Sequence, residues 1–83
     1  MQKIILYYKF VPINDPDMTM RWQRELCTRL NLKGRILISP HGINGTLGGD
    51  KHNLELYKRA MSDTDQFKNI VYKWSDGGTE HFP

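Results

Sequence analysis

The sequence predicts an α+β domain of the ferredoxin-like class, βαββαβ, in which a four-stranded antiparallel sheet carries two helices on one face. Three observations support this prediction. The segments follow one another as strand, helix, strand, strand, helix, strand, which is the split βαβ arrangement. Both helical segments have one apolar stripe, and each strand has one face that two helices could cover. Because βαβ crossovers are right-handed, strands one and three should be central, giving the spatial order 4-1-3-2.

The composition is that of one small folded domain. The chain has 83 residues, of which 39 % are apolar, enough for a single core. One cysteine excludes an internal disulfide bond. The start of the chain has neither a signal peptide nor an apolar run that could cross a membrane, so we expect a cytoplasmic protein. The net charge of +3 permits contact with RNA or another polyanion, although a solvated surface is the simpler explanation of scattered Lys and Arg residues.

The first strand is predicted over Lys3–Val11, which is rich in β-branched and aromatic residues. Alternation divides this strand into two faces. The wholly apolar face is expected to cover the core, and its residues are Ile4, Leu6, Tyr8 and Phe10. The other face, with Ile5, Tyr7 and Lys9, is expected to be half solvated or to meet a partner. Pro12 ends the strand.

The first helix is predicted to begin after Asp15, which can cap it, with Pro16 at the first helical position. Its buried stripe recurs every four residues, at Met18, Trp22, Leu26 and Leu30. Asn31 and Gly34 are expected to form the turn that ends it. Cys27 lies in this helix, away from any loop that could activate a thiol, and is expected to be packed and unreactive.

A tight β-hairpin is predicted over Gly34–Gly49. Two apolar runs, Ile36–Ile38 and Ile43–Leu47, flank a Pro-His-Gly corner. Pro40 has no N–H for a ladder and should lie in the turn. Gly42 can adopt the positive φ that a tight turn requires.

The second helix is expected to begin after Asp50, its N-cap. Although a glycine pair before a helix can bind phosphate, this carboxylate disfavours an anion there. The expected buried residues of the helix are Leu54, Tyr57 and Met61. The last strand is predicted over Ile70–Ser75, with Ile70, Tyr72 and Trp74 on one face and Val71 and Lys73 on the other.

These assignments leave one face of the sheet without helices. The residues expected there are Tyr7 and Lys9, Arg35 and Ser39, Asn44 and Thr46, and Lys73. A nucleic acid strand could stack a base on Tyr7 while the cations follow its phosphates. This interpretation requires Tyr7 and Lys9 to point away from the helices. The aromatic-rich third strand of sheet-face RNA binders is absent, and the preferred alternative is that the C-terminal part of a longer protein covers this face.

His41, in the hairpin turn, is a further candidate for partner contact, because turn tips are exposed. A plain turn residue is the simpler interpretation. The three histidines, His41, His52 and His81, share no ligand spacing, so we expect no metal site.

One stretch carries a family resemblance: Gly34-Arg-Ile-Leu-Ile-Ser-Pro-His-Gly-Ile-Asn-Gly-Thr-Leu-Gly-Gly49, preceded by Tyr-Tyr-Lys-Phe-Val-Pro at residues 7–12. It resembles the N-terminal domain of the rhodanese-related tRNA uridine hydroxylase family, over nearly the whole chain. The resemblance implies one acylphosphatase-like (ferredoxin-like) domain at residues 1–83. In that family a rhodanese domain with the catalytic cysteine follows, and this chain is expected to be the first part of such a protein.

The resemblance also implies a function. This domain would be a non-catalytic part, without a cofactor, of an oxygen-dependent tRNA wobble-uridine hydroxylase, and would help to hold tRNA for the rhodanese domain. Its partners would then be tRNA and its own rhodanese domain. The alternative is a protein-interaction or dimerisation module that docks through the open sheet face.

Acylphosphatase activity is not expected. Acylphosphatases resemble one another in a Gly-rich first loop that ends in a phosphate-binding arginine. Here the loop Pro12–Asp17 has two acidic residues and no arginine, and two carboxylates would repel a phosphoryl group. Asn44 could stand for the catalytic asparagine, but it has no role without an anion site.

Overall fold

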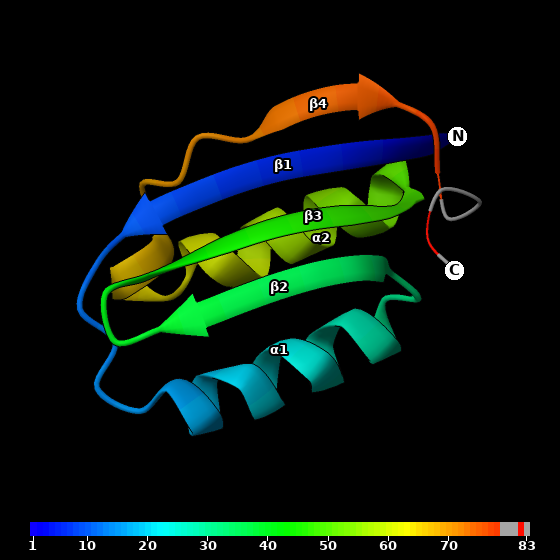
Figure 1. The fold of residues 1–83 in the computed structure, drawn as a ribbon. Coiled ribbons are helices and arrows are strands. Elements are labelled where there is room, and N and C mark those ends of the chain that lie inside the picture. The colour runs from blue at the N-terminus through cyan, green and yellow to red at the C-terminus, as the bar shows by residue number, and fades with distance from the viewer. Residues whose placement is uncertain (79–81, 83) are drawn as a thin grey trace.

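The computed structural model describes residues 1–78 and 82, and its order of elements confirms the predicted βαββαβ fold. The strands are β1 (Gln2–Phe10), β2 (Lys33–Ser39), β3 (Gly42–Asp50) and β4 (Lys73–Asp76). The helices are α1 (Pro16–Arg29), α2 (Lys51–Ser62) and the short 3₁₀ helix η1 (Asp65–Phe67). All strand pairs are antiparallel, in the order β2-β3-β1-β4 (Figure 1). This is the predicted order, with β1 and β3 in the centre.

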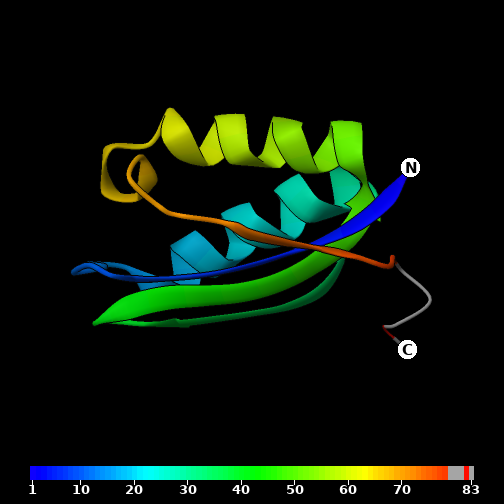
Figure 2. The same cartoon turned by 90° about the horizontal axis from the view of Figure 1, so that it is seen from above.

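Helices α1 and α2 lie side by side on one side of the sheet (Figure 2). Helix α1 packs against β2, and α2 packs against β3 and β1. The core between the two layers is made of Ile5, Tyr7, Ile13, Leu26, Leu32, Ile43, Leu47, Leu54, Tyr57, Met61 and Phe67. The stripe predicted for α2 is therefore confirmed. Within the described residues, no helix combines the length and apolar character needed to span a membrane.

The predicted N-caps of both long helices are confirmed. The Asp15 carboxylate accepts the Met18 N–H at 3.0 Å, and the Asp50 carboxylate accepts the His52 N–H at 3.1 Å. Asn31 ends α1 in a left-handed conformation, with φ of 55°. The predicted buried stripe of α1 is wrong at Met18, which is 64 % exposed, because Ile13 of the preceding loop fills the core at that end.

The two-residue turn of the hairpin, Pro40–His41, is as predicted. The role expected for Gly42 is wrong, since its φ is not positive. Gly42 is needed for a different reason. A Cβ atom there would lie 2.4 Å from the carbonyl oxygen of Lys9 on the neighbouring strand.

The predicted orientation of β1 is also wrong. Ile5 and Tyr7 are 0 % and 2 % exposed beneath the helices, and Lys9 shares their side of the strand. The apolar set expected in the core points the other way: Leu6, Tyr8 and Phe10 are 48 %, 70 % and 83 % exposed.

The strand register explains this reversal. It places Ile5 opposite Leu47 and Tyr7 opposite Gly45, on the side of β3 that faces the helices. A Cβ atom on Gly45 would lie 2.7 Å from the Tyr7 ring, so this glycine makes room for the tyrosine.

Candidate functional site

The face of the sheet opposite the helices, called the open face from here on, carries cross-strand rows of side chains, three of which extend from its middle to the hairpin end. The first row is Arg35, Thr46, Leu6 and Lys73; the second is Leu37, Asn44 and Tyr8; the third is Ser39, Gly42 and Phe10. Residues paired across antiparallel strands point to the same side, so each row is a line of neighbours. Apolar side chains from β1 and β2 therefore lie among polar ones from β2, β3 and β4.

The predicted candidates divide into two groups. Arg35, Asn44, Thr46 and Lys73 lie on the open face, as expected. Tyr7 and Lys9 do not, so the RNA-binding surface as predicted loses its aromatic residue and one cation. Residues that the sequence assigned to the core, Leu6, Tyr8 and Phe10, take their place on this face.

A hollow of about 360 Å³ lies at the hairpin end of the open face. The residues around it include Tyr8, Phe10, Leu37, Ser39, His41 and Asn44. The rings of Tyr8 and Phe10 meet edge to face, with centroids 5.8 Å apart. The hollow can thus receive an apolar side chain or a planar ring, with polar groups at its margin. His41 lies there because its carbonyl oxygen accepts the Val11 N–H at 3.0 Å, which joins the turn to the β1–α1 loop.

The β1–α1 loop does not form a phosphate-binding loop. Its Val11 and Ile13 N–H groups donate to the carbonyl oxygens of His41 and Pro40, both at 3.0 Å. Asp15 occupies the N-terminus of α1. The amides that would have to bind an anion are already paired, and a carboxylate holds the position a phosphate would need.

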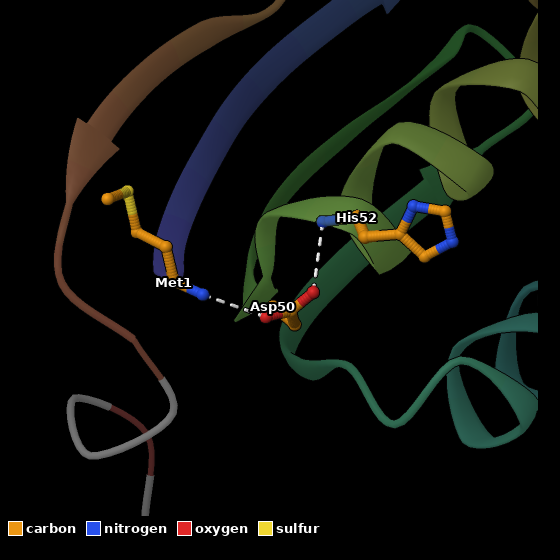
Figure 3. Close-up of polar contacts among 3 residues, drawn as sticks. All are labelled: Met1, Asp50 and His52. Carbon is orange, nitrogen blue, oxygen red and sulfur yellow. Dashed lines mark hydrogen bonds and ion pairs between the residues drawn. The ribbon is translucent and has the colours of Figure 1, made fainter.

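The N-terminus of α2 is filled in the same way (Figure 3). Asp50 accepts the Met1 ammonium group at 2.9 Å through one oxygen and the His52 N–H at 3.1 Å through the other. The ammonium group and, after it, the His52 N–H hold the pKa of Asp50 below its ordinary value of 3.8. This carboxylate links the start of β1 to the start of α2. It occupies the position at the helix N-terminus that a phosphate bound after the glycine pair would need.

A basic groove runs between α1 and the edge strand β2. Arg24 of α1 and Arg35 of β2 line it, together with Gln23, Cys27, Gly34 and Ile36. None of the described residues that line it is acidic, and neither arginine forms an ion pair within residues 1–78 and 82. The Arg24 side chain is thus free to meet an anion in the groove, while Arg35, whose side chain the strand register places on the open face, borders the groove along the edge strand. The sequence did not predict this groove, because the periodicity of a helix does not show which strand lies beneath it.

Cys27 lies at the wall of this groove and is half buried. Burial raises the pKa of its thiol from 9.0 to about 11, so the group stays protonated at neutral pH. This agrees with the prediction of a packed thiol. No three or more His, Cys, Asp or Glu side chains gather at a possible metal site in the described part of the chain; His81 lies outside that part.

The chain is similar in sequence to known proteins. Residues 2–83 match the family model described as the UPF0176 acylphosphatase like domain. The chain is 58 % identical over 81 residues to a tRNA uridine(34) hydroxylase of Corynebacterium diphtheriae, covering 98 % of this chain and 26 % of that protein. It is 48 % identical over 83 residues to a tRNA uridine(34) hydroxylase of an Arthrobacter species, covering 100 % of this chain and 28 % of that protein.

The chain thus spans about a quarter of the length of these relatives. The family model accounts for all but the first residue, and the βαββαβ fold agrees with its description. The chain therefore belongs to the UPF0176 family, as its N-terminal acylphosphatase-like domain.

Proposed function

We propose that this chain serves a tRNA uridine(34) hydroxylase as a non-catalytic domain that helps to hold tRNA for a reaction carried out elsewhere in the enzyme. The names of the relatives support a role in tRNA modification by an oxidoreductase. Because the chain spans about a quarter of their length, the larger remainder, expected to contain the rhodanese domain, is the place for catalysis and for any cofactor. Such an enzyme would work in the cytoplasm, where it meets tRNA.

The basic groove carries the proposal. Arg24 and Arg35 present two guanidinium groups that no described carboxylate neutralises. Arginine binds phosphate oxygens with two parallel hydrogen bonds, and such contacts position a nucleic acid without reading its sequence. Of the residues expected from the sequence to contact RNA, Arg35 thus keeps that role, now with a partner on α1.

The test is a titration of the 83-residue chain with a labelled tRNA anticodon arm that has uridine at position 34. Binding should weaken as salt rises, since phosphate contacts release counterions. The double substitution Arg24→Gln with Arg35→Gln should raise Kd about ten-fold or more. The slope of log K against log salt should also become less negative by about 1.4 to 1.8, which is the change expected for two lost phosphate contacts.

The matched control is Lys51→Gln with Arg59→Gln. These exposed cations lie on α2, and their replacement removes the same charge. The control should leave the salt slope and Kd near those of the unchanged chain. Equal weakening by both double substitutions, or no binding at low salt, would contradict the proposal.

A second candidate function, a docking module, is favoured by one observation. The open face exposes aliphatic and aromatic side chains that the core does not use. The two surfaces meet at the edge strand β2, where Arg35 borders both, and one domain can perform both functions.

A further inference from the structure

We infer that the open face is the surface on which this domain docks against the polypeptide that follows it in the relatives. The inference requires that the domain is part of a complete hydroxylase, as proposed above. It does not require that the domain holds tRNA. It commits to one occupant, an apolar protein surface from the same enzyme.

The open face exposes large apolar side chains. Leu6 and Leu37 are 48 % and 54 % exposed, and Tyr8 and Phe10 are more exposed still. Leu37, Tyr8 and Phe10 line one hollow, and Leu6 lies on the same face of β1 two residues before Tyr8, so the apolar groups form one patch. A contiguous apolar patch of this kind marks a site of contact with protein, a membrane or a ligand.

Aliphatic side chains distinguish protein from RNA as the occupant. Single-stranded nucleic acids bind to aromatic platforms bordered by cations, where bases stack. Leu6 lies in the same row as Arg35 and Lys73, between the two cations, and it offers no ring on which a base could stack. Arg35 and Lys73 instead form a charged rim around an apolar centre, which is the usual anatomy of a protein interface.

Phe82 lies beside Gly48 of β3. Gly48 pairs with Ile4 and Lys33, and its neighbour Leu47 faces the helices, so the free side of Gly48 belongs to the open face. A Cβ atom there would lie 2.6 Å from a ring carbon of Phe82. The last described residue therefore lies on the open face, over a glycine that has no side chain to displace it.

The relatives have ample polypeptide to cover the open face. This domain matches 26 % of the Corynebacterium diphtheriae protein, and it is the N-terminal part of the family, so nearly three quarters of such a protein comes after it. That polypeptide leaves the domain on the open face, beside the apolar patch. Docking there needs no long linker and covers the side chains that water would otherwise meet.

Tyr8 is the natural reporter for the test, because it is exposed in the middle of the patch. Nitration of Tyr8 by tetranitromethane, followed by peptide mass spectrometry, is compared between the 83-residue chain and a complete hydroxylase that contains it. A face that is docked at least nine-tenths of the time should slow the nitration of Tyr8 about ten-fold or more. Equal nitration rates in the two proteins would overturn the inference.

Charge placed in the patch should reverse this protection. The variant is Leu6→Glu with Leu37→Glu in the complete hydroxylase. Docking would bury its two carboxylates against an apolar surface, which is costly, so the docked state should be lost. Tyr8 should then react at the rate seen in the 83-residue chain. The matched control is Met18→Glu, an exposed apolar residue on the helical layer, which should leave Tyr8 protected. Circular dichroism of the same variants of the 83-residue chain checks that each one folds. Continued protection of Tyr8 in the double variant would contradict docking through this patch.

Two other occupants give distinct results, and each overturns the inference. A second copy of the chain would make the 83-residue chain sediment as a dimer in which Tyr8 reacts slowly. RNA would protect Tyr8 in the 83-residue chain when a tRNA anticodon arm is added, with the protection lost at high salt. Failure of tRNA holding is measured separately, by the tRNA titration of the 83-residue chain, in which no following polypeptide can dock.

Discussion

The hydroxyl groups of Tyr7 and Tyr57 form a hydrogen bond in the core, which ties the central strand β1 to helix α2. The Tyr57 hydroxyl donates in turn to Gln23 Oε1 at 2.6 Å, and Gln23 Nε2 donates to the Met61 sulfur at 3.3 Å. This chain of contacts reaches α1, so both helices and the sheet share one buried polar network. It satisfies the buried hydroxyls of both tyrosines, and it requires Tyr7 to face the helices.

The first prediction concerns that hydrogen bond. Tyr7→Phe should lower the free energy of unfolding by about 1 kcal/mol, because the buried Tyr57 hydroxyl then no longer accepts a hydrogen bond from Tyr7. Tyr8→Phe is the matched control on the neighbouring residue and should change stability by less than about 0.5 kcal/mol, because Tyr8 is exposed. Urea denaturation followed by fluorescence measures both. Equal losses would show that β1 does not have the orientation described.

The second prediction concerns Gly34, at the start of the hairpin. Its φ is 146°, and a Cβ atom there would lie 1.9 Å from the carbonyl oxygen of Thr46. Because both the conformation and a backbone atom exclude a side chain, Gly34→Ala should cost about 2 kcal/mol or more of unfolding free energy. Lys33→Ala, on the preceding exposed residue, should cost less than about 0.5 kcal/mol. A tolerated Gly34→Ala would mean that β2 pairs with β3 in another register.

The third prediction is a loss of stability in alkali. Burial raises the pKa of Cys27 to about 11 and also raises the pKa of Tyr7 and Tyr57 above the ordinary value of 10.0. The folded chain therefore holds these protons more tightly than the unfolded chain does. The stabilisation that this gives the folded chain is fully present below about pH 9, the ordinary pKa of a thiol. It is lost as the pH rises towards 11 and beyond.

Urea denaturation at pH 7.5, 9 and 10.5 measures this effect. The midpoint should stay level between the first two values and fall at the third. The Cys27 thiol should also react with iodoacetamide at pH 8 more slowly in the folded chain than in urea. A midpoint that does not change up to pH 10.5 would contradict the burial of these groups.

The topology was predictable because turn and cap residues act locally. Pro40 marks the hairpin, Asp15 and Asp50 mark the starts of the helices, and Asn31 marks the end of the first one. The order of the strands then follows from right-handed crossovers. None of these inferences needs to know which side of a strand is buried.

The orientation of β1 was not predictable from alternation. Both sets of alternate residues contain large apolar groups, and counting them favours the set with Leu6 and Phe10. Where both sets of alternate residues are apolar, alternation does not show which set is buried. The informative signal was Gly45, which lies on the helix-facing side of β3 and leaves room for a ring from the neighbouring strand. The groove between Arg24 and Arg35 depends on which strand lies beneath α1, and helix periodicity does not contain that information.

The orientation of β1 is the claim on which the open face depends, and one pair of neighbouring residues tests it most directly. Ile5 is fully buried and Leu6 is about half exposed, so Ile5→Ala should cost about 3 kcal/mol of unfolding free energy, and Leu6→Ala about 1 kcal/mol or less. Both are measured by urea denaturation of the 83-residue chain. A larger loss for Leu6→Ala than for Ile5→Ala would put the apolar patch back in the core and contradict the docking surface.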